Sequence, residues 1–599
     1  MTIDRRGALS LLALTTAAPL SAAAKTVKAA APGIDVSFNH GVASGDPLQN
    51  RVIIWTRVTP KDPQAPVDMR WQVAEDAAFQ RIAASGKWQA GIWRDHTVKV
   101  DVDGLKPGTE YFYRFLAGKT VSPVGRTKTL PQGATTDIVL AFVNCSLYPA
   151  GYFNAYDHLA KLDRIDAIVE LGDYYYEYGG PGSYGYDTGK AMGRVVEPQR
   201  NIITVDDYRT RHAQYKTDPD LQAAHARAPW ICVWDDHETA NDSWNGGAEH
   251  HDPKTEGPWI AREQAAMQAY YEWMPIREPA PGRAFEAINR SFQFGDLASL
   301  IMVETRLVGR TKQLSYARPE EIPMAVYSRE DAARKPITDP KIVSAVMAAV
   351  KAGQEPEEPY FTAPDVPALM ALLNEPDRQM LGARQEEWLK LEIAQSVAQG
   401  RPWQILGNQV VMGRCNAPDI VKEIGIEKAK ALVAAAPEAV RPRVKRYLDY
   451  FGLEMPYDLD GWDGYPAARE RLFDAIKLSN ANTVVVSGDS HSFWVNELFD
   501  APGTTRVAAE FGTGSVTSPS LGESFRSVDM GKLFADQNKE VLFNEQLRHG
   551  YVKLTVTKDS VTGELVSTEI TKKPYAAETF STWRVRPGDG PGVGAISKV

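Results

Sequence analysis

Six apolar runs of this chain each end in residues that bind metals or phosphate groups. Short runs of this kind predict buried strands, and an open α/β sheet presents its reactive groups at the carboxyl ends of its strands. We therefore expect the six clusters to converge and to form a polynuclear metal site. The runs are VLAFVNCS with Cys145, AIVELGDYYYEY with Asp173 and Tyr176, WICVWDDHETAN with Asp236, His237 and Asn241, LIMVETR with Glu304 and Arg306, WQILGNQ with Asn408, and TVVVSGDSHSFW with Asp489 and His491.

The chain has 599 residues, so more than one domain is expected. Residues 33–131 contain strand-like runs, such as RVIIWTRV and EYFYRFLAG, separated by turn sequences, and predict an all-β sandwich. Residues 137–565 alternate strands with amphipathic helices, which indicates an α/β domain. Helical insertions are expected near residues 310–375 and 416–450. Residues 566–599 are predicted to be a C-terminal tail, whose last stretch, RPGDGPGVGAISKV (586–599), is expected to be loosely ordered.

The first 24 residues are predicted to be a signal peptide of the twin-arginine type. Arg5 and Arg6 precede the apolar stretch LLALTTAAPL, and Ala22 and Ala24 form an A-x-A cleavage site before Lys25. An ordinary Sec signal is the alternative. We expect an exported protein, periplasmic or secreted, with the twin-arginine export machinery as a partner.

Charge and hydropathy exclude two classes of partner. The net charge of −9 gives no support for a nucleic-acid-binding partner. Beyond the signal segment no apolar run approaches the roughly 20 residues that span a bilayer, so no stable membrane insertion is expected. The chain is expected to be a monomer.

The donor types in the clusters discriminate among metals. A classical dizinc site is disfavoured, because only two of the chain's ten histidines lie in these clusters. The oxygen donors of Asp173, Asp236, Asn241 and Asp489 suit a hard cation such as Ca²⁺. Cys145, Tyr176 and His491 instead suit a transition metal, and thiolate with phenolate can stabilise the ferric state.

Three further residues are candidates for binding a phosphate group. Arg306 and Arg384 can form charge-assisted, bidentate contacts with phosphate oxygens, although a structural or surface arginine is the alternative for each. Asn408 can donate to the same group or cap a turn. All three are predicted as site residues.

Taken together, the motifs resemble those of the PhoD family of alkaline phosphatases, a branch of the calcineurin-like metallophosphatases. The resemblance runs from about residue 35 to 565 and is carried by FVNCS, GDYYYEY, WDDHE, SGDSH, WDGYPAARER, EFGTGSVTSPS and HGVASGDPLQNRVIIWTRV. It implies an α/β metallophosphatase core, with two facing mixed β-sheets flanked by helices, behind an N-terminal β-sandwich domain.

The resemblance also implies Fe³⁺ with Ca²⁺ beside it. On this basis Cys145, Asp173, Tyr176 and His491 hold iron, and Asp173 bridges to calcium. Asp236 and Asp489 complete the calcium ligands, while Asn241 is a further candidate that could belong to a second calcium ion. One departure is Glu304, where Asp is commoner in the family, and its longer side chain could shift Arg306.

The expected activity is hydrolysis of phosphomonoesters, and alternatively of phosphodiesters, by a metal-activated hydroxide without a covalent enzyme intermediate. His237 is expected to orient the phosphate or to protonate the leaving alkoxide, and Arg306 to neutralise phosphoryl oxygens. One rival is a phosphodiesterase or phospholipase D-like esterase that uses the same site. A more distant rival is a non-catalytic exported metal-binding protein.

Overall fold

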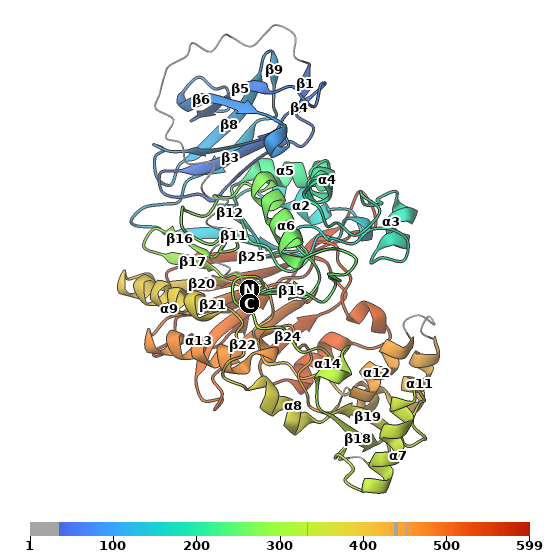
Figure 1. Ribbon diagram of the computed structural model, residues 1–599. Helices are drawn as coiled ribbons and strands as arrows, with labels where there is room; N and C mark the ends of the chain where they lie inside the picture. The colour runs from blue at the N-terminus through green and yellow to red at the C-terminus, as the bar shows by residue number, and fades with distance from the viewer. Residues whose placement is uncertain (1–34, 332, 436–440, 451) are drawn as a thin grey trace, which may run out of the picture.

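The computed structural model describes residues 35–331, 333–435, 441–450 and 452–599. Two large sheets lie at its centre, with the N-terminal β-domain at one end and helical insertions at the other (Figure 1). The predicted signal peptide, residues 1–24, lies outside the described residues. No helix in the described ranges is long and apolar enough to cross a membrane.

The first large sheet has ten strands in the order β28-β27-β26-β25-β11-β12-β13-β2-β3-β7. β11, β12 and β13 are parallel, as the alternation of strands and helices predicted, and β25 and β26 are antiparallel to each other. The strands are β2 (Val42–Gly45), β3 (Val52–Arg57), β7 (Thr97–Val102), β11 (Asp137–Val143), β12 (Ala167–Glu170), β13 (Trp230–Cys232), β25 (Gly550–Thr557), β26 (Val561–Thr568), β27 (Ala577–Val585) and β28 (Ser597–Lys598).

The second large sheet has seven strands in the order β16-β17-β20-β21-β23-β22-β24. β17, β20, β21 and β23 are parallel, and the others are antiparallel to their neighbours. The strands are β16 (Arg290–Phe294), β17 (Ala298–Met302), β20 (Trp403–Gly407), β21 (Thr483–Ser487), β22 (Phe493–Phe499), β23 (Arg506–Gly512) and β24 (Val541–Glu545).

The facing sides of the two sheets form one apolar core. Phe142 and Leu554 of the first sheet belong to the same buried cluster as Ile405, Val484 and Phe511 of the second. The near-continuous apolar sequence of these strands follows from this burial, because each strand is covered on both faces. The predicted metallophosphatase core of two facing mixed sheets is confirmed.

Helices cover the outer faces of both sheets (Figure 1). α9 and α13 pack on the second sheet through a separate buried cluster that includes Leu389, Leu472 and Leu406. The helices of these layers are α2 (Asn154–Ala160), α4 (Val205–Tyr215), α5 (Pro219–Arg227) and α6 (Trp259–Trp273) over the first sheet, and α9 (Ala383–Ala398) and α13 (Pro466–Leu478) over the second.

The N-terminal domain is a sandwich whose inner sheet continues into the core. Strands β2, β3 and β7 face a five-stranded sheet of order β10-β8-β5-β6, with β9 beside β8. β2 also pairs with β13 through Gly45 and Trp230, where an added Cβ on Gly45 would lie 2.5 Å from the Trp230 carbonyl oxygen. The remaining strands are β1 (Val36–Ser37), β4 (Thr59–Pro60), β5 (Val67–Ala74), β6 (Ile82–Ala90), β8 (Glu110–Ala117), β9 (Thr120–Val121) and β10 (Gly125–Lys128).

The insertions are less helical than the sequence suggested. The segment near 310–375 contains a two-stranded antiparallel sheet as well as helices, while the segment near 416–450 contains helices, as predicted. The elements of these and the smaller peripheral segments are β18 (Met324–Ser328), β19 (Tyr360–Pro364), α7 (Pro340–Lys351), α8 (Val366–Leu373), α10 (Ile420–Ile424), α11 (Ile426–Ala435), α12 (Arg441–Tyr450), α3 (Tyr186–Met192), α14 (Met530–Gln537), β14 (Ser243–Trp244) and β15 (Gly247–Ala248).

The C-terminal segment is more ordered than expected. β27 pairs with β26 along its length, and β28 pairs with β27. Trp583, Val585, Val593 and Ile596 are buried in the main apolar cluster. The prediction of a loosely ordered stretch over 586–599 was wrong, because Val593 and Ile596 pack on the core and Ser597–Lys598 form β28.

Candidate metal centre

The six predicted clusters lie where six parallel strands end. Cys145 follows β11, Asp173 follows β12, and the turn 235–238 follows β13. In the second sheet Arg306, Asn408 and Asp489 follow β17, β20 and β21. The two sheets meet at these ends, since Arg306 forms ion pairs with Asp235 of the first sheet and Asp489 of the second.

The ligand atoms converge around Asp173. Within the described residues, three groups offer donor atoms that lie within 4.8 Å of one another, and Asp173 belongs to all three. A carboxylate in this position can bridge two cations, because it has two oxygen atoms. The groups are Cys145, Asp173 and His491; Asp173, Asp236 and His237; and Asp173, Asp235, Asp236 and Asp489.

Four of these residues have left-handed backbone conformations. The φ angles are 54° at Cys145, 55° at Asp173, 61° at Asp489 and 58° at His491. A non-glycine residue in this region costs on the order of 1–3 kcal/mol and persists only where the surrounding structure over-determines it. Backbone strain is therefore present at four of the candidate ligands, as is common at functional sites.

One side of the centre has sulfur, nitrogen and phenol donors. The Cys145 sulfur lies 3.4 Å from Oδ2 of Asp173, and the Tyr176 hydroxyl lies 3.0 Å from Nε2 of His491. His491 Nδ1 donates to the Pro519 carbonyl at 2.7 Å, which leaves a lone pair on Nε2. Burial and the Asp173 carboxylate raise the pKa of the Cys145 thiol, so binding a cation as thiolate would displace its proton.

The other side is a cluster of buried carboxylates. Burial raises the pKa values of Asp173 and Asp489, and neighbouring carboxylates add to the shift. Oδ1 of Asp236 has no hydrogen-bond partner in the described part of the chain and lies 3.7 Å from the Arg306 guanidinium. Burying this many carboxylates with so little counter-charge is costly. The donor set therefore fits cations between the two sides.

Arg306 is fully buried and holds carboxylates in place. Its guanidinium contacts Oδ1 of Asp235, Oδ2 of Asp460 at 2.5 Å, and Oδ1 of Asp489 at 3.4 Å. With all three nitrogens on carboxylates and a side-chain exposure of 0%, Arg306 is not free to contact a phosphate. In place of the expected contact with phosphate, the Arg306 side chain positions these carboxylates.

The side chain of Glu304, which is longer than the aspartate expected at this position, is accommodated by hydrogen bonds to the backbone. Its carboxylate accepts hydrogen bonds from the backbone N–H groups of Arg306 at 2.9 Å, Leu307 at 2.7 Å and Val308 at 2.8 Å. The indole of Trp234 donates to it at 3.0 Å. Glu304 caps the turn after β17 and so fixes the backbone from which Arg306 extends.

We expect the substitution Arg306→Met to lower the free energy of unfolding of the metal-free protein by about 3–5 kcal/mol, because it leaves buried carboxylates without their counter-charge. The matched control is Arg384→Met, at the exposed start of α9, with an expected change of less than about 0.5 kcal/mol. Urea titration measures both values. Equal stability of the two variants would contradict the role given to Arg306.

His237 is paired with a carboxylate that the sequence reasoning missed. Nδ1 of His237 lies 2.6 Å from Oε2 of Glu177, whose other oxygen accepts from the backbone N–H of Asn241 at 2.8 Å. Burial alone lowers the pKa of His237, but the carboxylates of Asp236, Glu177 and Asp173 outweigh it and raise the pKa well above its usual value. These neighbouring carboxylates therefore favour the protonated form of the ring.

Three predicted site residues lie outside the groups of convergent donor atoms. Asn241 lies beside the centre, and its Oδ1 accepts from the Tyr178 hydroxyl at 2.8 Å. The Asn408 side chain donates to the Val410 carbonyl and accepts from the Trp462 indole at 3.1 Å, so it braces a turn. Arg384 is exposed, and no contact joins it to the centre among the described residues. The structure therefore does not bring Asn408 and Arg384 into a phosphate site.

Other residues that the sequence reasoning left unassigned complete the surroundings. Ser518 lies 2.7 Å from the Tyr176 hydroxyl. The Asn144 amide, oriented to satisfy both of its atoms, accepts from the Asp489 backbone N–H at 2.9 Å and donates to the Gly514 carbonyl at 3.0 Å. Both residues stand in motifs that carried the family resemblance. The motifs therefore pointed to these residues, although the sequence did not reveal their roles.

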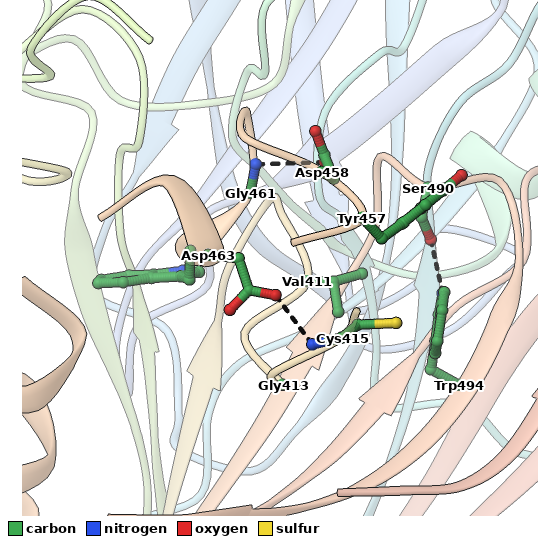
Figure 2. A pocket seen from close by; sticks show the side chains of 10 residues that line it. Val411, Gly413, Cys415, Tyr457, Asp458, Gly461, Asp463, Ser490 and Trp494 are labelled. Carbon is green, nitrogen blue, oxygen red and sulfur yellow. Dashed lines mark hydrogen bonds between the residues drawn. The ribbon is translucent and has the colours of Figure 1, made fainter. Parts of the chain in front are cut away.

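A small pocket lies beside the centre (Figure 2). Ser490, between Asp489 and His491 in the sequence, accepts from the Trp494 indole at 2.8 Å, and the backbone N–H of Cys415 donates to Asp463 at 2.8 Å. The volume of the pocket is about 20 Å³, which is enough for a water molecule or a methyl-sized group. The pocket alone is therefore too small to bind a substrate.

Two facing mixed sheets with metal-type donors at their strand ends are the architecture of a metallophosphatase, a class of metal-dependent hydrolase. Comparisons with known proteins support this class and narrow it. The family model described as PhoD-like phosphatase matches residues 140–565, and the model described as PhoD-like phosphatase, N-terminal domain, matches residues 22–131.

Two relatives cover almost the whole chain. Alkaline phosphatase D of Bacillus subtilis (strain 168) is 33% identical over 575 residues, which cover 93% of this chain and 83% of the relative. A solved structure titled "Structure of PhoD" is 30% identical, with a TM-score of 0.70 over 94% of this chain and 92% of that one. The chain belongs to the PhoD-like phosphatase family and is a phosphoric ester hydrolase.

Proposed function

We propose that the centre binds Fe³⁺ beside Ca²⁺ and hydrolyses phosphomonoesters. One observation carries the proposal: Asp173 is shared by a side with sulfur and nitrogen donors and a side with oxygen donors only. Soft and borderline donors favour a transition metal, whereas carboxylates favour calcium. Asp173 would therefore contribute a ligand to each of two different cations.

The donors divide between the two cations as follows. Cys145, Tyr176 and His491 would hold iron together with Asp173, and Asp236 with Asp489 would hold calcium, with Asn241 as a further candidate. When bound, the cations would supply Lewis acidity toward a phosphoryl oxygen and toward water.

The chain's own residues supply proton transfer and orientation. Glu177 holds the His237 ring through Nδ1, which leaves the Nε2 proton for the leaving oxygen of the substrate. Arg306, from the second sheet, keeps Asp235 of the first sheet and Asp489 of its own sheet in place. His237 is therefore our candidate general acid, and Arg306 acts through the carboxylates that it positions.

Phosphomonoesters are the proposed substrates, and phosphodiester or phospholipase D-like hydrolysis at the same centre is the alternative. Membership of a phosphatase family leaves the non-catalytic alternative without support. We also propose export through the twin-arginine route, on the residue pattern around Arg5 and Arg6. An exported protein whose sequence begins at Lys25 would support the export route.

The test combines metal analysis with kinetics on protein purified without chelator. We expect roughly one iron per chain together with calcium, and a visible charge-transfer band from thiolate or phenolate. We expect a higher kcat/KM on nitrophenyl phosphate than on bis-nitrophenyl phosphate, and loss of turnover after chelation. Zinc or manganese without colour would overturn the roles of Cys145 and Tyr176, and a preference for the diester would favour the alternative substrate.

A further inference from the structure

The carboxylate of Glu238 joins the two loops that follow β12 and β13. Oε1 accepts from the backbone N–H of Tyr174 at 2.6 Å, and Oε2 accepts from those of Asp173 at 3.1 Å and Asp235 at 2.9 Å. The side chain is buried. Losing this acceptor would leave backbone donors unpaired in the interior, so the carboxylate holds these peptide groups in one arrangement.

The loop after β12 needs such a restraint. Asp173 has a left-handed backbone, with φ of 55°, and Gly172 before it has φ of 114°. A Cβ added to Gly172 would lie 2.4 Å from Cβ of Asp235, so the two loops are in direct contact. The Tyr175 hydroxyl adds a further bond, to the Glu238 carbonyl oxygen at 3.1 Å. These contacts over-determine a conformation that is unfavourable by itself.

Glu238 acts through its neighbours, since it belongs to none of the groups of convergent donor atoms found in the described ranges. We propose that Glu238 is a positioning residue that sets the spacing between Asp173 and Asp236, and through this spacing the affinity of the centre for its cations. The inference rests on the proposed metal centre. Residues that support metal ligands in this way commonly change metal affinity by about 10–100-fold when mutated.

The substitution Glu238→Gln tests the role with little change in shape. The amide can accept hydrogen bonds at one atom only, and its NH₂ group would face backbone donors. We expect the affinity for iron and calcium to fall about 10–100-fold, measured as the metal retained after dialysis against graded EDTA. In metal-free protein, we expect faster amide exchange at Asp173, Tyr174 and Asp235.

The chain offers a matched control in Glu510. Its buried carboxylate also accepts two backbone N–H groups, from Met412 at 2.7 Å and Gly413 at 2.9 Å, and the Asn496 amide at 2.7 Å. The loop that it caps carries none of the candidate ligands. We expect Glu510→Gln to speed amide exchange at Met412 and Gly413 and to leave metal affinity unchanged. Equal metal loss in both variants would reduce the Glu238 effect to general destabilisation and overturn the inference.

Glu238→Asp is the second variant if Glu238→Gln fails to fold. It keeps the charge but shortens the side chain by one methylene, so an intermediate loss of affinity is expected, whereas wild-type affinity would overturn the inference. The wild-type protein in the same titration separates the two proposals. A wild-type protein without iron or calcium would sink the proposed metal centre, whereas a metal-replete wild type with an equally replete Glu238→Gln variant would sink only the positioning role.

Discussion

Replacing Cys145 with alanine is expected to remove iron from the centre and to lower kcat/KM on phosphomonoesters by about 10⁴-fold. This factor corresponds to roughly 5 kcal/mol, which is the scale of Lewis-acid stabilisation of a transition state. The physical reason is the donor set: Cys145 is the sulfur donor of its group, and it lies 3.4 Å from the shared Asp173 carboxylate. Elemental analysis and the visible spectrum measure the iron independently of turnover.

Cys415→Ala is the matched control for this prediction. Cys415 is also a buried free thiol, but it lines the small pocket and belongs to none of the metal-binding groups found in the described ranges. We expect this variant to retain iron and the charge-transfer band. A Cys145→Ala protein with full iron content and full activity would show that the thiol is not a ligand.

The substitution His237→Ala is expected to retain iron and calcium and to lower kcat by about 10²–10⁴-fold. The imidazole is held by Glu177 and surrounded by carboxylates that favour its protonated form. Because a general acid matters most for poor leaving groups, the loss should be larger on an alkyl phosphate than on nitrophenyl phosphate. Comparing kcat on the two substrates measures this difference directly.

His250→Ala is the control for His237. His250 contacts the Tyr178 hydroxyl at 3.2 Å and belongs to none of the donor groups in the described part of the chain. We expect its rates on both substrates to stay near those of the wild type. Loss of a cation from His237→Ala would instead make the ring a ligand, together with Asp173 and Asp236. An equal loss of rate on both substrates would contradict the general-acid role.

Local sequence determined the strands and the chemistry at their ends. Apolar runs such as VLAFV and TVVVS could only be buried on both faces, and both are central strands of the two sheets. The polar residues that follow them were readable for the same reason, because the strand end places Cys145, Asp173 and Asp489 at the edge of the sheet.

Tertiary structure decided which partners these residues have. Nothing in the local sequence distinguishes Glu177 and Glu238 from other acidic residues. Because the loops after β12 and β13 approach each other, Glu177 contacts His237, and Glu238 accepts hydrogen bonds from the backbone of both loops. Arg306 and Arg384 were equivalent candidates, but one is enclosed by carboxylates and the other is exposed on α9. Such distinctions depend on contacts between segments far apart in the chain, which local composition and periodicity do not encode.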